Sequence, residues 1–303
     1  MVEKLTSDIG FSEAPVRVSE WRRFRRVFFE RRLVTFGLVI LLLMVIAAIF
    51  APLLAPYDPY ELGDAGESLL QPSGEHLLGT DILGRDTLSR LIYGARTALM
   101  VGFISVFIAG FIGVPLGIIA GYFSGVINMV IMRVMDALMC FPMLLLALVL
   151  AAVLREYAIS GIWVVIIALS VAIIPGYARV THGVTLSIKE NDYILAQRAL
   201  GSSNMRVMFS HILPNAFPPL IVLMTMQLGA LILAEAGLSF LGIGIDPPGA
   251  AWGAMVFDGY KYLASHPVLW LAPGIAIALV VFAFNMVGDG LRDALDPRLR
   301  GLL

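Results

Sequence analysis

Charged residues are scarce in this sequence. Of its 303 residues only 14% are Asp, Glu, Lys or Arg, whereas 59% are hydrophobic, and the mean hydropathy is +0.89. Soluble globular domains carry about 25% charged residues. The composition therefore excludes a water-soluble domain and indicates a protein embedded in a lipid bilayer. The formal net charge of −1 gives no overall basic field, so we expect no nucleic-acid partner.

Residues that carry catalytic or metal chemistry are also few. Cys140 is the single cysteine, which excludes an intrachain disulfide and a sulfur-rich metal site. None of the three lysines lies in a Gly-Lys-Ser/Thr phosphate-binding loop, so the chain cannot hydrolyse ATP by that route. No His-Glu-x-x-His zinc motif is present, and no histidine lies in an apolar run to activate Ser239 as a hydrolase nucleophile. We expect the chain not to be an enzyme and to bind no metal or cofactor of its own.

Long apolar runs are abundant. Six are long enough to cross about 30 Å of hydrocarbon at about 1.5 Å per residue. The sequence therefore predicts an all-α polytopic membrane protein with six transmembrane helices. Pro142 and Pro175 can kink the third and fourth spans, and the fifth is long enough to be tilted or broken at Gly237. The predicted spans are Leu33–Phe50, Ala98–Ala120, Ala137–Leu154, Gly161–Ala178, Ala216–Ile243 and Val268–Gly288.

The basic residues between these spans predict the topology. With the N-terminus inside, 16 of the 21 Lys and Arg residues fall on the cytoplasmic side, which is where membrane proteins retain them. We therefore expect both termini to be cytoplasmic. The expected parts are a cytoplasmic tail with an amphipathic helix (1–32), the first span with an outer loop (33–97), a core of five spans (98–288) with a cytoplasmic loop at 179–215, and a cytoplasmic C-terminal tail (289–303).

Aromatic and basic residues alternate just before the first span. Trp21, Phe24 and Phe28 recur at helical spacing among arginines. This pattern suits an amphipathic helix at the lipid headgroups, and a plain basic topology anchor accounts for it equally well.

The polar segment between the fourth and fifth spans predicts a short exposed helix. Asp192 can cap a helix that runs to Leu200, and Gly201 can end it because glycine adopts the left-handed conformation without strain. Its apolar and small residues, Ile194, Leu195 and Ala199 among them, can lie in a groove on another protein. Three prolines then precede or begin the fifth span, where they suit the first turn of a helix but not its interior: Pro214, Pro218 and Pro219.

This segment resembles the cytoplasmic coupling loop of ATP-binding-cassette importer permeases. The family pattern is Glu-Ala-Ala, three residues, Gly, and about ten residues later Leu-Pro, and here Ala196, Gly201, Leu213 and Pro214 match it. The ending His-Ile-Leu-Pro-Asn, 211–215, is similar to the dipeptide, oligopeptide and nickel group and to its C-type subunit. The resemblance implies that the ATPase-coupling residues are Asp192, Tyr193, Leu195, Ala196, Gln197, Ala199, Gly201, Leu213 and Pro214.

One position departs from the pattern. Leu195 stands where the family has Glu, so the acidic residue expected to contact the ATPase is missing. Glu190 or Asp192 could supply a charge instead.

Four further stretches resemble C-type permeases in the same order along the chain: 51–59, 76–97, 234–255 and 283–301. In 76–97, Gly-Thr-Asp and Gly-Arg-Asp precede a short helix that leads to the second span. The outer loop around them contains seven acids, and either meets a soluble substrate-binding protein or is merely solvated. Those acids are Asp58, Glu61, Asp64, Glu67, Glu75, Asp81 and Asp86.

The resemblance implies a type I importer permease fold in a bacterial inner membrane. It implies a homologous B-type permease as partner, two ATP-binding subunits that bind the ATP and Mg²⁺, and an extracytoplasmic substrate-binding protein. The expected function is a permease subunit of a binding-protein-dependent, ATP-driven importer of di- or oligopeptides. Relatives also carry glutathione and nickel complexes, so the substrate stays open.

Glu235 is the one acid well inside a predicted span. An ionisable group in a membrane is costly, which makes it a candidate for a gate or translocation path, although it could equally cap or pair within the bundle. The alternative function is an ion-gradient-driven secondary transporter or channel that uses Glu235. That class commonly shows internal repeats, and no convincing repeat relates the two halves of the chain.

Overall fold

The computed structural model describes residues 20–64, 66–157 and 160–295, and within these ranges it contains helices and loops but no strand beyond one isolated bridge. The all-α prediction is therefore confirmed. The elements are α1 (Glu20–Glu30), α2 (Arg32–Ile49), α3 (Ala51–Leu54), α4 (Thr87–Tyr122), α5 (Val126–Met139), α6 (Met143–Arg155), α7 (Gly161–Lys189), α8 (Asp192–Ala199), α9 (Asn204–Arg206), the π-helix η1 (Val207–Ile212), α10 (Leu213–Phe240), α11 (Trp252–Tyr260) and α12 (Val268–Leu295).

Five predicted spans correspond to helices that are long and apolar enough to cross a membrane: α2, α4, α7, α10 with the turns before it, and α12. The helix of the second span begins at Thr87 and continues unbroken for 36 residues, so the expected separate short helix is its first turns. Of the two alternatives for the fifth span, tilted or broken at Gly237, the break is excluded, because α10 continues through Gly237 to Phe240. The expected kink at Pro175 does not end α7 either.

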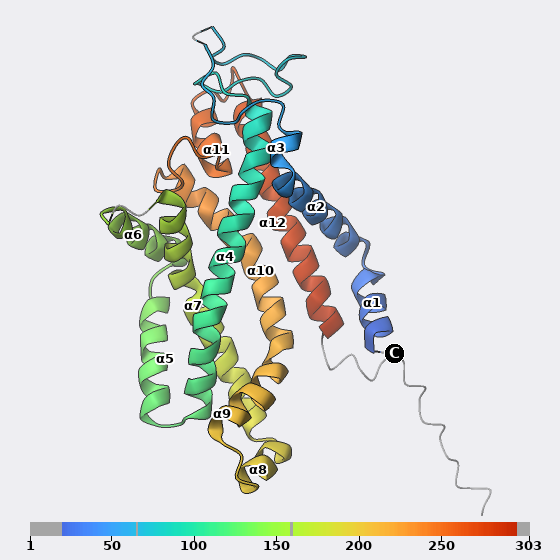
Figure 1. The fold of residues 1–303 in the computed structure, drawn as a ribbon, viewed down its shortest axis with the longest axis vertical. Coiled ribbons are helices and arrows are strands. Elements are labelled where there is room, and N and C mark those ends of the chain that lie inside the picture. Colours follow the sequence, from blue (N-terminus) through green and yellow to red (C-terminus); the bar gives the residue numbers. More distant parts are fainter. Residues whose placement is uncertain (1–19, 65, 158–159, 296–303) are drawn as a thin grey trace, which may run out of the picture.

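The third predicted span, Ala137–Leu154, is bent, and the kink predicted at Pro142 is confirmed. Its residues belong to α5 and α6, which meet at an angle of 92°. Pro142 occupies the turn between them, where its missing N–H and fixed φ suit the start of α6 and not a helix interior. Asp136 on α5 pairs with Arg179 on α7. The α5–α6 pair forms a bent element: α5 runs along the bundle, and α6 turns aside at its edge (Figure 1).

Close approach of two long helices forms the centre of the bundle. Three glycines at four-residue spacing line α4 where it meets α7: Gly113, Gly117 and Gly121. A Cβ on Gly117 would lie 2.3 Å from the carbonyl oxygen of Ala178, so only glycine permits this contact. Small residues that let backbones approach are a common basis of helix packing in membranes.

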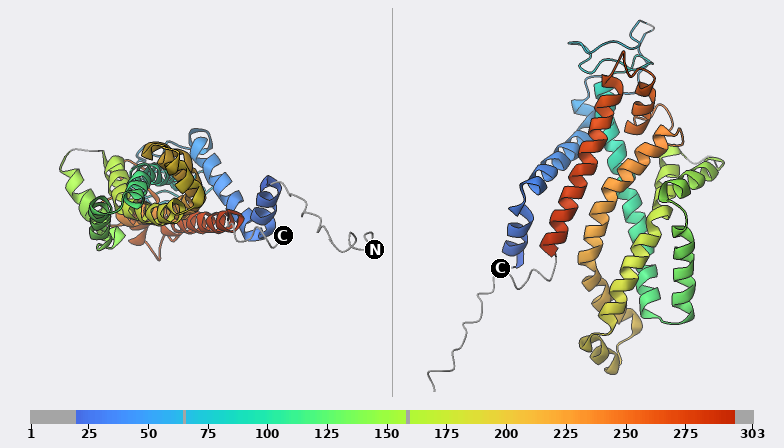
Figure 2. Two further views of the ribbon diagram at one scale, coloured as in Figure 1. Left: turned by 90° about the horizontal axis from the view of Figure 1, so that it is seen from below. Right: turned by 180° about the vertical axis from the view of Figure 1, so that it is seen from behind.

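The two ends of the bundle carry different structures. The loop between α3 and α4 lies at one end, here the loop end, and α8 lies at the other, here the α8 end (Figures 1 and 2). The first turn of α1 and the last turn of α12 both point toward the α8 end. The first and last described helices therefore end on the same side of the bundle as α8, whereas the predicted positions of the two termini fall on residues outside the described ranges.

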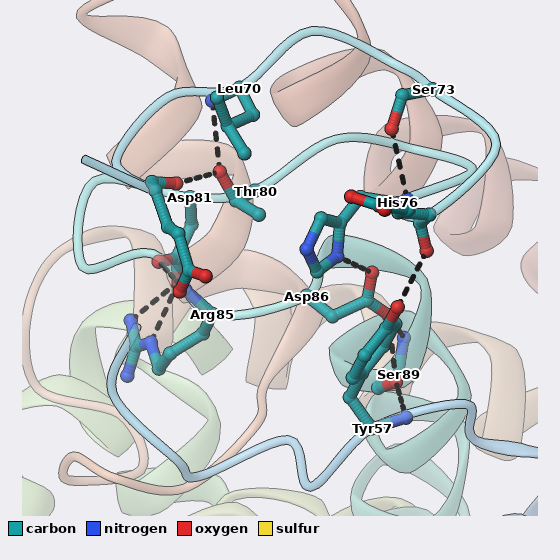
Figure 3. Close-up of polar contacts among 11 residues, drawn as sticks. Tyr57, Leu70, Ser73, His76, Thr80, Asp81, Arg85, Asp86 and Ser89 are labelled. Atoms are coloured by element: carbon teal, nitrogen blue, oxygen red, sulfur yellow. Dashed lines mark hydrogen bonds and ion pairs between the residues drawn. The ribbon is translucent and has the colours of Figure 1, made fainter. Parts of the chain in front are cut away.

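Buried polar contacts order the base of the loop between α3 and α4 (Figure 3). Asp86 caps α4 by accepting from the backbone N–H and the hydroxyl of Ser89, each at 2.7 Å, and its second oxygen lies 3.0 Å from Nδ1 of His76. Asp81 accepts from the Arg85 guanidinium at 2.8 Å. Both carboxylates are buried. These two of the seven acids therefore stabilise the loop itself and are not part of its exposed acidic surface.

Candidate functional site

The candidate coupling helix, α8, begins where α7 ends. Asn191, not Asp192, occupies its N-cap position, and no side chain accepts a capping hydrogen bond there, so the predicted Asp192 cap is wrong. Asp192 is instead the first helical residue, where a negative charge is favourable near the positive end of the helix dipole.

The end of α8 follows the sequence prediction. Gly201 adopts φ of +81° and donates to the carbonyl of Arg198, while the N–H of Ser202 donates to the carbonyl of Gln197, both at 3.0 Å. This pair of bonds is a Schellman motif. The Ser202 hydroxyl also donates to Oε1 of Gln197 at 2.8 Å. Gln197 is therefore engaged in closing the turn.

One side of α8 is seated in the bundle and the other is exposed. Ile194 is fully buried among apolar residues that include Val207 and Ile212, so the expectation that it could enter a partner's groove is wrong. Leu195 and Leu200 are 47% and 81% exposed. The other predicted residues with exposed side chains on α8 are Asp192, Tyr193, Ala196 and Ala199.

Polar contacts join the end of α4 to α8 and to the neighbouring helices α7 and α9. The Arg198 guanidinium lies 4.7 Å from the ring centroid of Tyr122, the last residue of α4. The Tyr122 hydroxyl donates to Oδ1 of Asn204 at 2.7 Å, and Nζ of Lys189 donates to the carbonyl of Gly121 at 3.1 Å. The sequence reasoning missed Tyr122 and Asn204, because no local pattern connects residues 82 positions apart.

The Leu-Pro pair of the motif begins α10 rather than extending the exposed surface of α8. Pro214 has no N–H to give to the carbonyl of Ser210, and the π-helix η1 directly precedes it. Asn215 donates to the carbonyl of His211 at 2.7 Å. Leu213 lines an apolar cavity of about 420 Å³ between α4 and the start of α10, together with Phe111, Met205, Phe209 and Phe217 among others.

Glu235 lies far from α8, about 33 Å along α10 from Leu213 at 1.5 Å per residue. Its side chain is buried in the bundle, and its Oε1 accepts from the Ser239 hydroxyl at 2.7 Å. Glu235 does not line the apolar cavity beside Leu213. Within the ranges given above, no group of three or more His, Cys, Asp or Glu side chains could hold a metal ion.

Comparison with known proteins identifies relatives along almost the whole chain. Residues 113–301 match the family described as "Binding-protein-dependent transport system inner membrane component", and residues 19–72 match the "N-terminal TM domain of oligopeptide transport permease C". The dipeptide transport system permease protein DppC of Alkalihalophilus pseudofirmus is 41% identical over 93% of this chain and 91% of its own. The glutathione transport system permease protein GsiD of Salmonella paratyphi A is 44% identical over 93% and 90%.

A solved structure supports the fold. The inward-facing MetNI methionine ABC transporter aligns over 68% of this chain and 96% of its own, with a TM-score of 0.57 and 21% identity. With the family match covering more than half of the sequence, the chain belongs to the binding-protein-dependent transport system inner membrane components, as an ABC importer permease of the C-type peptide group.

Proposed function

We propose that this chain is the permease subunit that forms the translocation path of an ATP-driven di- or oligopeptide importer with a homologous B-type permease. Two ATP-binding subunits lie on the cytoplasmic side, where they bind ATP and Mg²⁺, and one of them docks on α8. An extracytoplasmic binding protein delivers the peptide at the loop end. Both termini are cytoplasmic, and the membrane is the bacterial inner membrane.

The observation that carries this proposal is the two-sided character of α8. Ile194 and the Arg198–Tyr122 contact hold the helix to the bundle, while Leu195 and Leu200 remain exposed at its tip. A helix held firmly on one side can transmit a displacement of its partner to the helices that it touches. Leu195, which replaces the acidic residue of the family pattern, supplies an apolar contact to the ATPase in place of a charged one.

Uptake by whole cells tests the coupling surface. In cells lacking this permease and carrying a plasmid copy, we expect uptake of radiolabelled di- and tripeptides to return with the wild-type chain. Leu195→Arg should lower uptake at least about tenfold, because a buried leucine contributes about 1.5–3 kcal/mol to a contact. Leu195→Met is the matched control, since it keeps an apolar side chain of similar volume at the same exposed position. Equal uptake by all three chains would contradict the role of α8.

The energy source separates this proposal from a secondary transporter. Uptake should survive a proton ionophore while cellular ATP is maintained and should stop when the ATP-binding subunits are deleted. The reverse pattern, together with loss of uptake in Glu235→Gln, would favour an ion-gradient mechanism through Glu235. Glutathione as a competing substrate would decide between the two substrate classes carried by the relatives.

A further inference from the structure

A cleft of about 510 Å³ opens at the loop end of the bundle, far from α8. Four separate segments form its walls: the chain after α3 at Tyr60, one face of α4 at Tyr93, Arg96, Thr97 and Met100, the start of α7 at 160–162, and the loop between α10 and α11 at 245–250. Its size falls in the range of small-molecule sites, about 300–1,000 Å³.

Two arginines outside the cleft hold its walls in place. Buried Arg90 donates to the carbonyl oxygens of Pro59 and Pro248, at 3.1 and 3.4 Å, and so joins the segment of Tyr60 to the loop of Gly249. Arg155 donates to the carbonyl of Gly244 and to Oδ1 of Asp246, both at 2.8 Å. These bonds make the cleft a preformed feature of the fold, so a ligand would not have to order its walls.

The charges in the cleft do not balance. Asp246 is paired through Oδ1 with Arg155, which lies outside the cleft, so its negative charge is already balanced. The Arg96 guanidinium forms no ion pair or hydrogen bond with any residue in the described ranges, and its side chain is exposed. Arg96 is therefore the charge in the cleft that is available to a ligand.

Two tyrosines add neutral donors beside Arg96. The rings of Tyr60 and Tyr93 meet edge to face with centroids 5.8 Å apart, and neither hydroxyl has a partner among the described residues. Burial raises the pKa of the Tyr60 hydroxyl, which keeps it protonated and able to donate. A carboxylate accepts such bonds on two oxygens, and arginine can bind it in a bidentate manner.

We propose that this cleft binds the C-terminal carboxylate of a peptide through Arg96, with Tyr60 and Tyr93 as hydrogen-bond donors. The inference rests on the proposed function for its ligand class and assigns the permease its own substrate contact at the loop end. There the peptide would be held by its carboxylate, the group common to every unmodified peptide, which permits recognition of varied side chains.

Saturation-transfer NMR with trialanine as the probe tests the site. The full-length chain, purified from its native membrane with the subunits that accompany it, is placed in phosphatidylcholine nanodiscs. We expect trialanine to bind, and trialanine amide, which lacks the carboxylate, to bind at least about tenfold more weakly, as expected for loss of a charged hydrogen bond. Arg96→Gln should weaken trialanine binding by a similar factor, and Arg96→Lys, which keeps the charge but not the fork of donors, should weaken it less.

The control is Arg133→Gln, which removes an exposed arginine from α5 and should leave binding unchanged. Absence of binding to the wild-type chain, equal binding of the amide, or an unaffected Arg96→Gln variant would each overturn the site. Displacement of trialanine by equimolar inorganic phosphate would assign the cleft to anions in general and would also overturn it. These results are independent of uptake: loss of the site with intact peptide uptake leaves the proposed function standing, whereas binding without chain-dependent uptake refutes the proposed function alone.

Discussion

Ile194 is expected to determine how firmly α8 is held to the bundle. The side chain is fully buried, and Ile194→Ala removes three carbon atoms from this environment. At about 0.8 kcal/mol for each carbon, the loss is about 2.4 kcal/mol, within the range of about 2–5 kcal/mol for such substitutions. Since about 1.4 kcal/mol corresponds to a factor of ten, local opening of α8 should become about 50-fold more frequent.

Hydrogen exchange measured by mass spectrometry can detect this opening. In Ile194→Ala, amides of residues 192–200 should exchange about 50-fold faster, whereas those in the centre of α7 should be unchanged. Leu195→Ala is the matched control, because Leu195 neighbours Ile194 but is 47% exposed. It should leave exchange in the isolated permease unaltered. Unchanged exchange in Ile194→Ala, or equal acceleration in both variants, would refute the anchoring role of Ile194.

Three further predictions concern backbone strain, buried charge and pH. Gly201→Ala should destabilise the end of α8 by about 1–2 kcal/mol, because a φ of +81° is unfavourable for any residue with a Cβ, even though no neighbour lies within 4 Å of that Cβ. Gly183→Ala, also without neighbours but inside α7, should leave exchange in α8 unchanged and stabilise α7 by about 0.5–1 kcal/mol, because alanine is favoured over glycine in a helix. Asp81→Asn should lower the free energy of unfolding by about 3–5 kcal/mol, because it leaves the buried Arg85 guanidinium without its carboxylate. The midpoint of thermal unfolding should fall accordingly, and an unchanged midpoint would contradict the importance of this pair. Burial raises the pKa of Asp258, so the folded state binds this proton more tightly than the unfolded state, and the stability of the protein falls as pH rises through the raised pKa. Asp258→Asn should therefore raise the melting temperature at neutral pH and lose this advantage near the ordinary pKa of 3.8. A difference in melting temperature that stays constant across pH would refute the assignment.

The spans were predictable where a single apolar run forms a single helix. Five of six runs do so, because crossing hydrocarbon requires length and hydropathy that are visible in the sequence. The third run does not form one straight helix, because it passes through Pro142, where the predicted kink turns the chain by 92°. Arg133 and Asp136 interrupt the apolar run, so the sequence predicts a loop for the part of α5 before Ala137. In the structure the negative charge of Asp136 is paired with Arg179 on α7, more than 40 residues away. Hydropathy alone cannot anticipate such a partner.

At the candidate site, the local sequence predicts the helix α8 but not which of its faces is buried. Gly201 and the extent of α8 follow from turn chemistry that depends only on neighbouring residues. Ile194 and Leu195 are adjacent and equally apolar, so the sequence could not say that the first is buried and the second exposed. That distinction depends on contacts with η1, and the Arg198–Tyr122 contact likewise depends on the close packing of α4 against α7.

Photo-crosslinking from α8 tests the central claim most directly. A benzophenone amino acid replaces Leu195 in one variant and Leu77 in another, and native membranes are irradiated before the adducts are identified by mass spectrometry. The account predicts that position 195 yields an adduct with an ATP-binding subunit and that position 77 does not. Failure of position 195 to capture an ATP-binding subunit, or equal capture from both positions, would contradict α8 as the surface that couples this permease to ATP hydrolysis.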